Sequence, residues 1–190
     1  HKDIALFPLP GSRKDRSVSA SYSLWRAMLE DPSVHHRVAH PPRASRVLAA
    51  GEVAGVRTEV WMGGAHTSHG DDLTATTLGA SWLIDCAGDI DRSYRELTSR
   101  WLACVFPDLD GPLTSPARIS EVVSESLAAI LDGNGAAPER IYVMCQHGMT
   151  RSGLVSGLIL RGLGLEAAET IDRIRRARPG ALANDYFCQM

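Results

Sequence analysis

The chain alternates between short apolar runs and segments in which apolar residues recur with helical spacing. Runs rich in apolar and β-branched residues predict strands or hairpin edges. These runs are 46–49, 53–56, 58–62, 82–86, 102–106 and 141–144. Apolar residues three or four positions apart predict helices. These helices are expected at 73–78, 91–101, 116–132, 152–161 and 166–177. The order of the segments predicts an α/β fold with a mostly parallel central sheet flanked by helices.

Turn-forming residues mark several element boundaries. Ser115 and Pro116 favour a helix start, with serine as the N-cap and proline at the first helical position. Gly133 is expected to end that helix, and the Arg-Pro-Gly sequence at 178–180 is expected to end the last one. Ligands of such sheets bind at the carboxyl ends of the strands. The loop after the strand at 141–144 is therefore expected to contribute to a binding site.

Residues 1–45 differ in character from the rest of the chain. Turn-forming residues and paired histidines and prolines surround one helical patch at 22–30. We expect an N-terminal extension with one short helix at 1–45, followed by a single α/β domain at 46–190. The extension either packs on the domain as an arm or helps to recognise its ligand.

The composition suits one globular domain. The 190 residues are 44% hydrophobic and 22% charged, with a net charge of -2. This charge argues against a general nucleic-acid or membrane-surface binder. No apolar run approaches the roughly 18 residues of a membrane span, and the first residues lack the apolar stretch of a signal peptide, so the protein is expected to be cytoplasmic. A solvated basic helix face is expected from Arg173, Arg175, Arg176 and Arg178.

The spacing of the four cysteines indicates neither a disulfide framework nor a zinc ribbon. We expect reduced thiols, with Cys104 and Cys188 packed in the core. His66 and His69 are close enough in sequence to share a metal ion, but turn-forming residues surround them and no third ligand is indicated. The sequence therefore predicts neither a metal site nor another cofactor.

The most informative segment is Cys-Gln-His-Gly-Met-Thr-Arg at 145–151, which lies between a predicted strand and a predicted helix. A strand, a short loop and a helix in this order aim backbone amides at one point, where the helix N-terminus adds partial positive charge. Gly148 allows a positive φ, and the Arg151 guanidinium can bind two oxygens of a phosphoryl group. The predicted phosphate-binding residues are Gln146, His147, Gly148, Met149, Thr150 and Arg151.

Cys145 gives this loop its own nucleophile. The loop amides, the helix terminus and Arg151 all favour the thiolate, which is the form that attacks phosphorus. Ser152 can donate a hydrogen bond to the sulfur when the sulfur leaves in a second, hydrolytic step. The scheme requires no metal.

Protonation of the leaving group requires a carboxylic acid near the bound phosphate. The segment Phe-Pro-Asp-Leu-Asp-Gly-Pro at 106–112 follows a predicted strand and supplies two candidates. We favour Asp108 over Asp110 because Pro107 stiffens the backbone directly before it and a Gly-Pro bend follows. This loop is expected to bring Asp108 close to a phosphate bound at Cys145.

The motif C-x-x-G-x-x-R-S-G at 145–153 resembles that of the cysteine-dependent dual-specificity protein phosphatases, a branch of the protein tyrosine phosphatase superfamily. The segments at 58–64, 78–85 and 178–187 are also similar to parts of that family. The resemblance therefore covers about residues 58 to 190, and it implies the fold of that family for this part of the chain.

The resemblance also implies an activity. A protein of this family hydrolyses phosphotyrosine, and in some cases phosphoserine or phosphothreonine, through a cysteinyl-phosphate intermediate. By that resemblance Cys145 is the nucleophile, Arg151 clamps the phosphate, Asp108 is the general acid and Ser152 assists departure of the thiolate. The expected partner is a phosphorylated protein or peptide, without a membrane and without a cofactor.

Several residues define the alternatives. Met144 stands where the family usually has histidine, so Cys145 depends more on the loop amides and the arginine clamp, and a module that binds phosphoproteins without turnover stays open. His147 resembles the RNA 5′-triphosphatase branch, which leaves an RNA 5′-polyphosphate phosphatase as another alternative. The acidic net charge and the apparent acid Asp108 argue against an RNA substrate.

Cys86 resembles the backdoor cysteine of some relatives. By that resemblance Cys86 is a redox partner that forms a disulfide with oxidised Cys145. The other interpretation of Cys86 is an inert buried thiol.

Overall fold

The computed structural model describes residues 44–64, 79–88, 98–108, 113, 115–132 and 134–189. These residues belong to one compact unit that spans Pro41–Met190. The helices predicted at 22–30 and 73–78 lie outside the described residues, as do residues 91–97 of the helix predicted at 91–101. The end of that helix was predicted wrongly, because Arg100 and Trp101 belong to a strand. The division into an extension and a domain at residue 45 stays a prediction.

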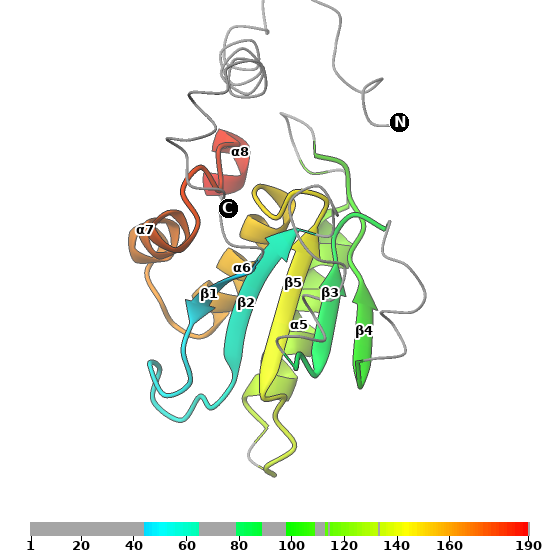
Figure 1. The fold of residues 1–190 in the computed structure, drawn as a ribbon, viewed down its shortest axis with the longest axis vertical. Helices are drawn as coiled ribbons and strands as arrows, with labels where there is room; N and C mark the ends of the chain where they lie inside the picture. Colours follow the sequence, from blue (N-terminus) through cyan, green and yellow to red (C-terminus); the bar gives the residue numbers. More distant parts are fainter. Residues whose placement is uncertain are drawn as a thin grey trace, which may run out of the picture. The chain divides into compact units, whose positions relative to one another are not determined.

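The described strands form a five-stranded sheet in the order β1-β2-β5-β3-β4 (Figure 1). Their bounds are Ala44–Leu48 for β1, Glu59–Gly64 for β2, Trp82–Asp85 for β3, Arg100–Ala103 for β4 and Arg140–Cys145 for β5. β1 runs antiparallel to β2, and the other neighbouring pairs are parallel. Together with the helices packed on it, this sheet confirms the predicted α/β fold.

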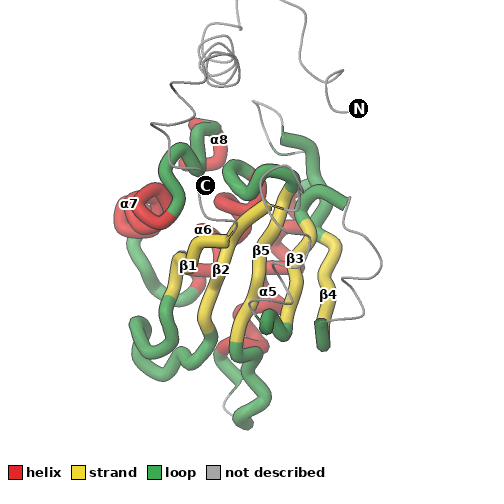
Figure 2. The backbone as a smooth tube through the Cα atoms, viewed as in Figure 1, coloured by secondary structure: helices red, strands yellow, loops and turns green. Residues whose placement is uncertain are grey.

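The described helices are α5 (Pro116–Ile130), α6 (Arg151–Gly162), α7 (Ala167–Ala177) and α8 (Asp185–Cys188). α6 packs against β5 and β2, α5 packs against α6, and α7 packs against α6 and β1. In Figure 2, α5 and α6 lie behind the sheet and α7 lies beside β1. Within the described ranges, no helix is long and apolar enough to cross a membrane.

Alternation of side chains along β5 divides the core into two clusters. Ile141, Val143 and Cys145 lie in the larger cluster, together with buried residues of α5, α6 and α7. Tyr142 and Met144 lie in a smaller cluster with Leu83 of β3 and Ala80. Successive residues of a strand point to opposite faces of the sheet. The cysteine therefore faces the helices, whereas the methionine before it faces away from them.

The run at 53–56, which was predicted as a strand or a hairpin edge, forms no strand. It belongs to the turn between β1 and β2, where Gly55 has a φ of +78°. The amide of Gly51 donates to the carbonyl of Val56 over 2.8 Å and closes the turn. Val56 is buried. The apolar residues of this run pack against the core without pairing with a neighbouring strand.

The strand predicted at 102–106 is displaced toward the N-terminus. β4 ends at Ala103, and residues 104–108 continue as an extended loop. Cys104 and Phe106 are buried in that loop. The apolar pattern at 102–106 thus predicts correctly that Cys104 and Phe106 are buried, although the strand itself ends at Ala103.

The helix boundaries agree closely with the turn signals, with small differences. Pro116 opens α5 as predicted, while Ser115 occupies the N-cap position without a side-chain capping bond. The sequence did not predict the short α8. Its N-cap is Asn184, whose side chain accepts a hydrogen bond from the Tyr186 amide over 3.0 Å.

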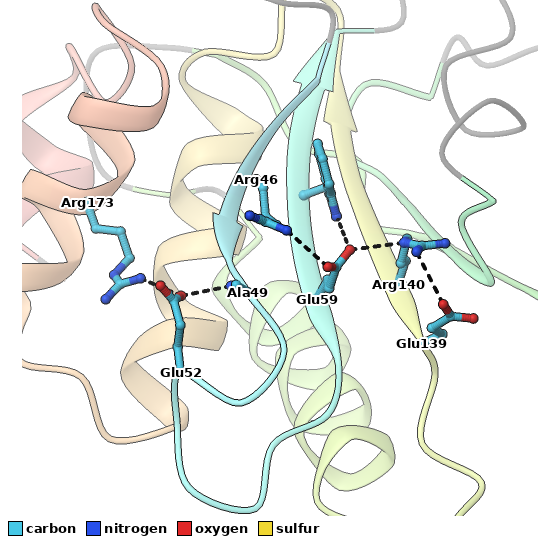
Figure 3. Close-up of polar contacts among 8 residues, drawn as sticks. Arg46, Ala49, Glu52, Glu59, Glu139, Arg140 and Arg173 are labelled. Carbon is cyan, nitrogen blue, oxygen red and sulfur yellow. Dashed lines mark hydrogen bonds and ion pairs between the residues drawn. The ribbon is translucent and has the colours of Figure 1, made fainter.

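A polar network ties together three strands at the end of the sheet where β2 and β5 begin (Figure 3). The Glu59 carboxylate accepts hydrogen bonds from Trp61 Nε1 at 2.9 Å, Arg140 Nε at 3.0 Å and Arg46 at 3.2 Å. Burial raises the pKa of Glu59, but the hydrogen bonds from these three donors outweigh burial, and the pKa is lowered overall. The network therefore stabilises the ionised carboxylate.

Glu59→Gln is expected to reduce the free energy of unfolding by about 1 kcal/mol at neutral pH, because it replaces the acceptor of charge-assisted hydrogen bonds. Since the folded-state pKa is depressed, this stabilisation is present above the unfolded-state pKa of about 4.3 and is lost as the pH falls through the lower folded-state value. Urea unfolding of the wild type and of Glu59→Gln at about pH 7 and about pH 3 measures this difference in the free energy of unfolding.

A suitable control is Glu139→Gln, because the Glu139 side chain is 74% exposed and forms only a surface ion pair with Arg140. This control should change stability by less than about 0.5 kcal/mol. An equal loss for Glu59→Gln at both pH values would contradict the linkage.

Candidate active site

The loop at 146–150 connects the central strand β5 to α6. Cys145 is the last residue of β5, and Arg151 is the first residue of α6. β5 lies between β2 and β3, so the loop emerges at the middle of the sheet, at the carboxyl ends of its parallel strands (Figure 1). The predicted order of strand, loop and helix is therefore confirmed.

The Cys145 sulfur is buried and lies between a backbone amide and a hydroxyl group. The amide of Gly148 donates to Cys145 Sγ over 3.2 Å, and Ser152 Oγ lies 3.4 Å from the same sulfur. Cys145 is only 2% exposed, and Ser152 is fully buried. A backbone donor, a hydroxyl group and the N-terminus of α6 thus converge on this sulfur.

Gly148 lets the loop fold back against the end of β2. Its φ is +72°, and a Cβ at this position would lie 2.1 Å from the carbonyl carbon of Gly63 and 2.3 Å from the nitrogen of Gly64. Any side chain would therefore collide with backbone as well as strain the left-handed conformation. The glycine in the motif is a steric requirement of this loop.

Arg151 and Asp108 come together although they are far apart in the sequence. Arg151 Nε lies 3.8 Å from Asp108 Oδ2, which is within ion-pair range but too long for a hydrogen bond. Arg151 Nε is buried and makes no hydrogen bond within the described part of the chain. A phosphoryl oxygen would satisfy this donor. The structure thus brings Asp108 to the mouth of the loop, whereas Asp110 lies outside the described residues.

Arg178 contacts the loop at 146–150, which the sequence did not predict. It was expected on a solvated helix face, but it is only 2% exposed. Its guanidinium donates to the carbonyl of His147 and to Ser45 Oγ, both over 3.3 Å. Burial lowers the pKa of Arg178, while the nearby Tyr142 and Cys145 favour its charged form. The only sequence signal was its position directly before Pro179, where the helix had to end.

Three cysteines occupy one row across neighbouring strands. Asp85 pairs with Met144 on one side and Ala103 on the other, so the next residue, Cys86, follows the register between Cys145 and Cys104. All three thiols belong to the main core cluster. Burial, followed by the hydrogen bond to Cys104, raises the pKa of Cys86 well above its usual value. The same hydrogen bond lowers the pKa of Cys104.

Met144 and Tyr142 lie on the face of the sheet opposite Cys145. Both are buried, and the Tyr142 hydroxyl donates to the carbonyl of Gly64 over 3.2 Å. Burial raises the pKa of Tyr142. Because Met144 faces away from Cys145, its side chain packs with apolar residues such as Leu83 and not beside the Cys145 sulfur.

The described residues contain no group of three or more histidine, cysteine, aspartate or glutamate side chains that could hold a metal ion. His66 and His69 lie outside the described residues. What the described site offers a ligand is the Gly148 amide, the N-terminus of α6, the Arg151 guanidinium and the Asp108 carboxyl group. This set suits a phosphoryl group better than a cation.

No protein-family profile and no curated protein sequence matches the chain. Solved structures do resemble it. Human DUSP28 is 18% identical, with a TM-score of 0.57 over 78% of this chain and 92% of that chain. Tk-PTP in its active form is 18% identical, with a TM-score of 0.56 over the same shares. A mouse putative dual specificity phosphatase complexed with zinc tungstate is 19% identical, with a TM-score of 0.57 over 80% and 87%. The chain therefore has the fold of the dual-specificity phosphatases in the protein tyrosine phosphatase superfamily.

Proposed function

We propose that this protein is a cysteine-dependent phosphatase that hydrolyses phosphotyrosine, and also phosphoserine or phosphothreonine, in proteins. The observation that carries the proposal is the environment of the Cys145 sulfur. It accepts a hydrogen bond from the Gly148 amide, lies 3.4 Å from Ser152 Oγ and sits in a loop that ends at Arg151. A buried nucleophile inside an anion-binding loop suits covalent phosphoryl transfer.

In the first step the Cys145 thiolate attacks phosphorus while the loop amides and Arg151 hold the equatorial oxygens. A sulfur–phosphorus bond forms, the phosphorus–oxygen bond to the substrate breaks, and Asp108 gives its proton to the departing oxygen. The products are the dephosphorylated side chain and a cysteinyl-phosphate. The proximity of Asp108 to Arg151 supports this role because the acid lies beside the group that would hold the phosphate.

In the second step a water molecule attacks the phosphorus of the cysteinyl-phosphate. The Asp108 carboxylate takes a proton from this water, the sulfur–phosphorus bond breaks, and inorganic phosphate leaves. The Ser152 hydroxyl donates a hydrogen bond to the departing sulfur, which its 3.4 Å distance permits after a small adjustment. No metal takes part in either step of this scheme.

Cys145→Ser should abolish hydrolysis of a phosphotyrosine peptide in metal-free buffer. Asp108→Asn should lower kcat by about 10²- to 10³-fold, because the leaving group then departs without a proton. Affinity for the phosphopeptide should survive Asp108→Asn. Steady-state kinetics and peptide binding by calorimetry measure the two effects.

Wild-type protein that binds the phosphopeptide without turnover would support a binding module instead. If wild-type protein neither binds nor hydrolyses the peptide, 5′-triphosphorylated RNA is the next substrate to assay. Thiol-dependent release of phosphate from that RNA would replace the protein substrate with an RNA one.

Ser152→Ala should slow the second step more than the first. With an aryl phosphate that has a good leaving group, we expect a burst of phenol equal to the enzyme concentration, followed by turnover about tenfold slower than in the wild type. Stopped-flow absorbance measures the burst. Ser156→Ala is the matched control, because Ser156 is buried one turn further along α6. A Ser152→Ala variant with wild-type kcat and no burst would remove this serine from the mechanism.

We also propose that Cys86 protects Cys145 from over-oxidation. Peroxide would convert the Cys145 thiolate to a sulfenic acid, and the Cys86 sulfur would displace its oxygen as water to form a disulfide. Neighbouring strands lie about 4.8 Å apart, which is within the Cα separation that disulfides accept. The shared row of Cys86 and Cys145 supports this pairing.

Peroxide treatment followed by peptide mapping should yield a Cys86–Cys145 disulfide and reversible loss of activity. In Cys86→Ala the loss should become irreversible, because Cys145 then proceeds to the sulfinic acid. Cys188→Ala is the control, since Cys188 lies outside the row. A Cys86–Cys104 disulfide as the sole product would instead assign Cys104 as the partner of Cys86 and leave Cys145 unprotected.

A further inference from the structure

Arg178 occupies an unusual place for a charged residue. It caps the C-terminus of α7 and is only 2% exposed. One end of its guanidinium donates to Ser45 Oγ on β1, and the other donates to the carbonyl of His147 in the phosphate loop. The side chain thus connects α7, β1 and the loop through one rigid, planar group.

The carbonyl that Arg178 holds belongs to the peptide unit that serves the nucleophile. No cis peptide bond occurs in the described residues, so the His147–Gly148 unit is planar and trans. In such a unit the C=O and N–H bonds point in opposite directions. Arg178 holds the oxygen at 3.3 Å, and the N–H at the other side donates to Cys145 Sγ at 3.2 Å. A rotation of this plane would weaken both hydrogen bonds at once.

The loop has a particular need for such a restraint at Gly148. Glycine is required there because of its φ of +72° and its contact with Gly63. The same residue type leaves the backbone freer to leave that conformation than any other. A hydrogen bond from a side chain fixed by the surrounding core can restrict this freedom without adding a Cβ.

The burial of Arg178 fits this role better than simple packing does. Burying a guanidinium is unfavourable unless its donors are satisfied and an opposite charge is near. Its two guanidinium ends donate to Ser45 Oγ and to the His147 carbonyl, so burial is offset at least in part by these hydrogen bonds. An apolar side chain could fill the same space without the cost of burying a charge, but it could not donate a hydrogen bond to the His147 carbonyl.

We infer that Arg178 is a positioning residue, which holds the His147 carbonyl so that the Gly148 amide points at the Cys145 sulfur. The inference rests on the proposed function for its effect on turnover. The effect of Arg178 on the reactivity of the Cys145 thiol does not depend on any substrate. The positioning role and the proposed function can therefore be tested separately.

The experiment compares Arg178→Lys and Ser45→Ala with Ile174→Val as the control. Lysine keeps the charge but cannot bridge Ser45 and the loop. Ile174 is fully buried in the same helix, so its truncation lowers stability without touching the loop. Each folded variant is assayed for kcat and KM on an aryl phosphate and for the rate of Cys145 alkylation by iodoacetamide, followed by peptide mapping at one fixed pH.

Arg178→Lys should lower kcat and the Cys145 alkylation rate by about tenfold, with a smaller change in KM, because the thiolate loses an aligned donor. Ser45→Ala, which only loosens the guanidinium, should lower both by about twofold. Ile174→Val should reduce the melting temperature and leave both rates at wild-type values.

Wild-type kcat and alkylation in folded Arg178→Lys would overturn the inference and leave Arg178 a structural residue. If Arg178→Lys does not fold, the Ser45→Ala variant tests the inference. A kcat and a Cys145 alkylation rate equal to those of Ile174→Val would overturn the inference, whereas lower values would support it. If the wild type hydrolyses no phosphate ester, the proposed function fails, while the alkylation rates still test the positioning role.

Discussion

The hydrogen bond from the Gly148 amide to the Cys145 sulfur is the contact on which the rest of the site depends. It requires a loop so tight that residue 148 touches the backbone at the end of β2, which only glycine permits. It also requires β5 to stop at Cys145 and α6 to begin at Arg151, so that the helix terminus faces the same point. The sheet, the glycine and the helix together shape the proposed phosphate site around the Cys145 thiol.

The sheet order explains how distant segments reach this loop. β5 lies at the centre, with β2 on one side and β3 and β4 on the other. The segment after β4 is an extended loop that places Asp108 next to Arg151. At the end of α7, Arg178 contacts the carbonyl of His147 in the phosphate loop. The carboxyl group of Asp108 thus reaches the loop from the segment after β4, and the buried guanidinium of Arg178 reaches it from the end of α7. Asp108 reaches Arg151 because β4 and β5 belong to the parallel part of the sheet, where the carboxyl ends of the strands share one side.

The sequence predicted well where the signal was local. The spacing of Cys145, Gly148 and Arg151 reflects one tight turn, and an alternation of apolar runs and helical segments suffices for a mostly parallel sheet. It predicted poorly where tertiary packing decides. The run at 53–56 is apolar but turns, because a glycine and a backbone hydrogen bond replace strand pairing. Arg178 follows other arginines in the sequence, yet it is buried, and only its contact with the loop reveals why.

The central claim is that Cys145 carries the phosphoryl group during turnover. Rapid acid quenching of wild-type protein during hydrolysis of an aryl phosphate, followed by digestion and mass spectrometry, tests it most directly. The account predicts one phosphorylated peptide, which contains Cys145, at close to one phosphate per protein when water attack is the slow step. Turnover without a phosphorylated peptide, or with the phosphate on another residue, would contradict it.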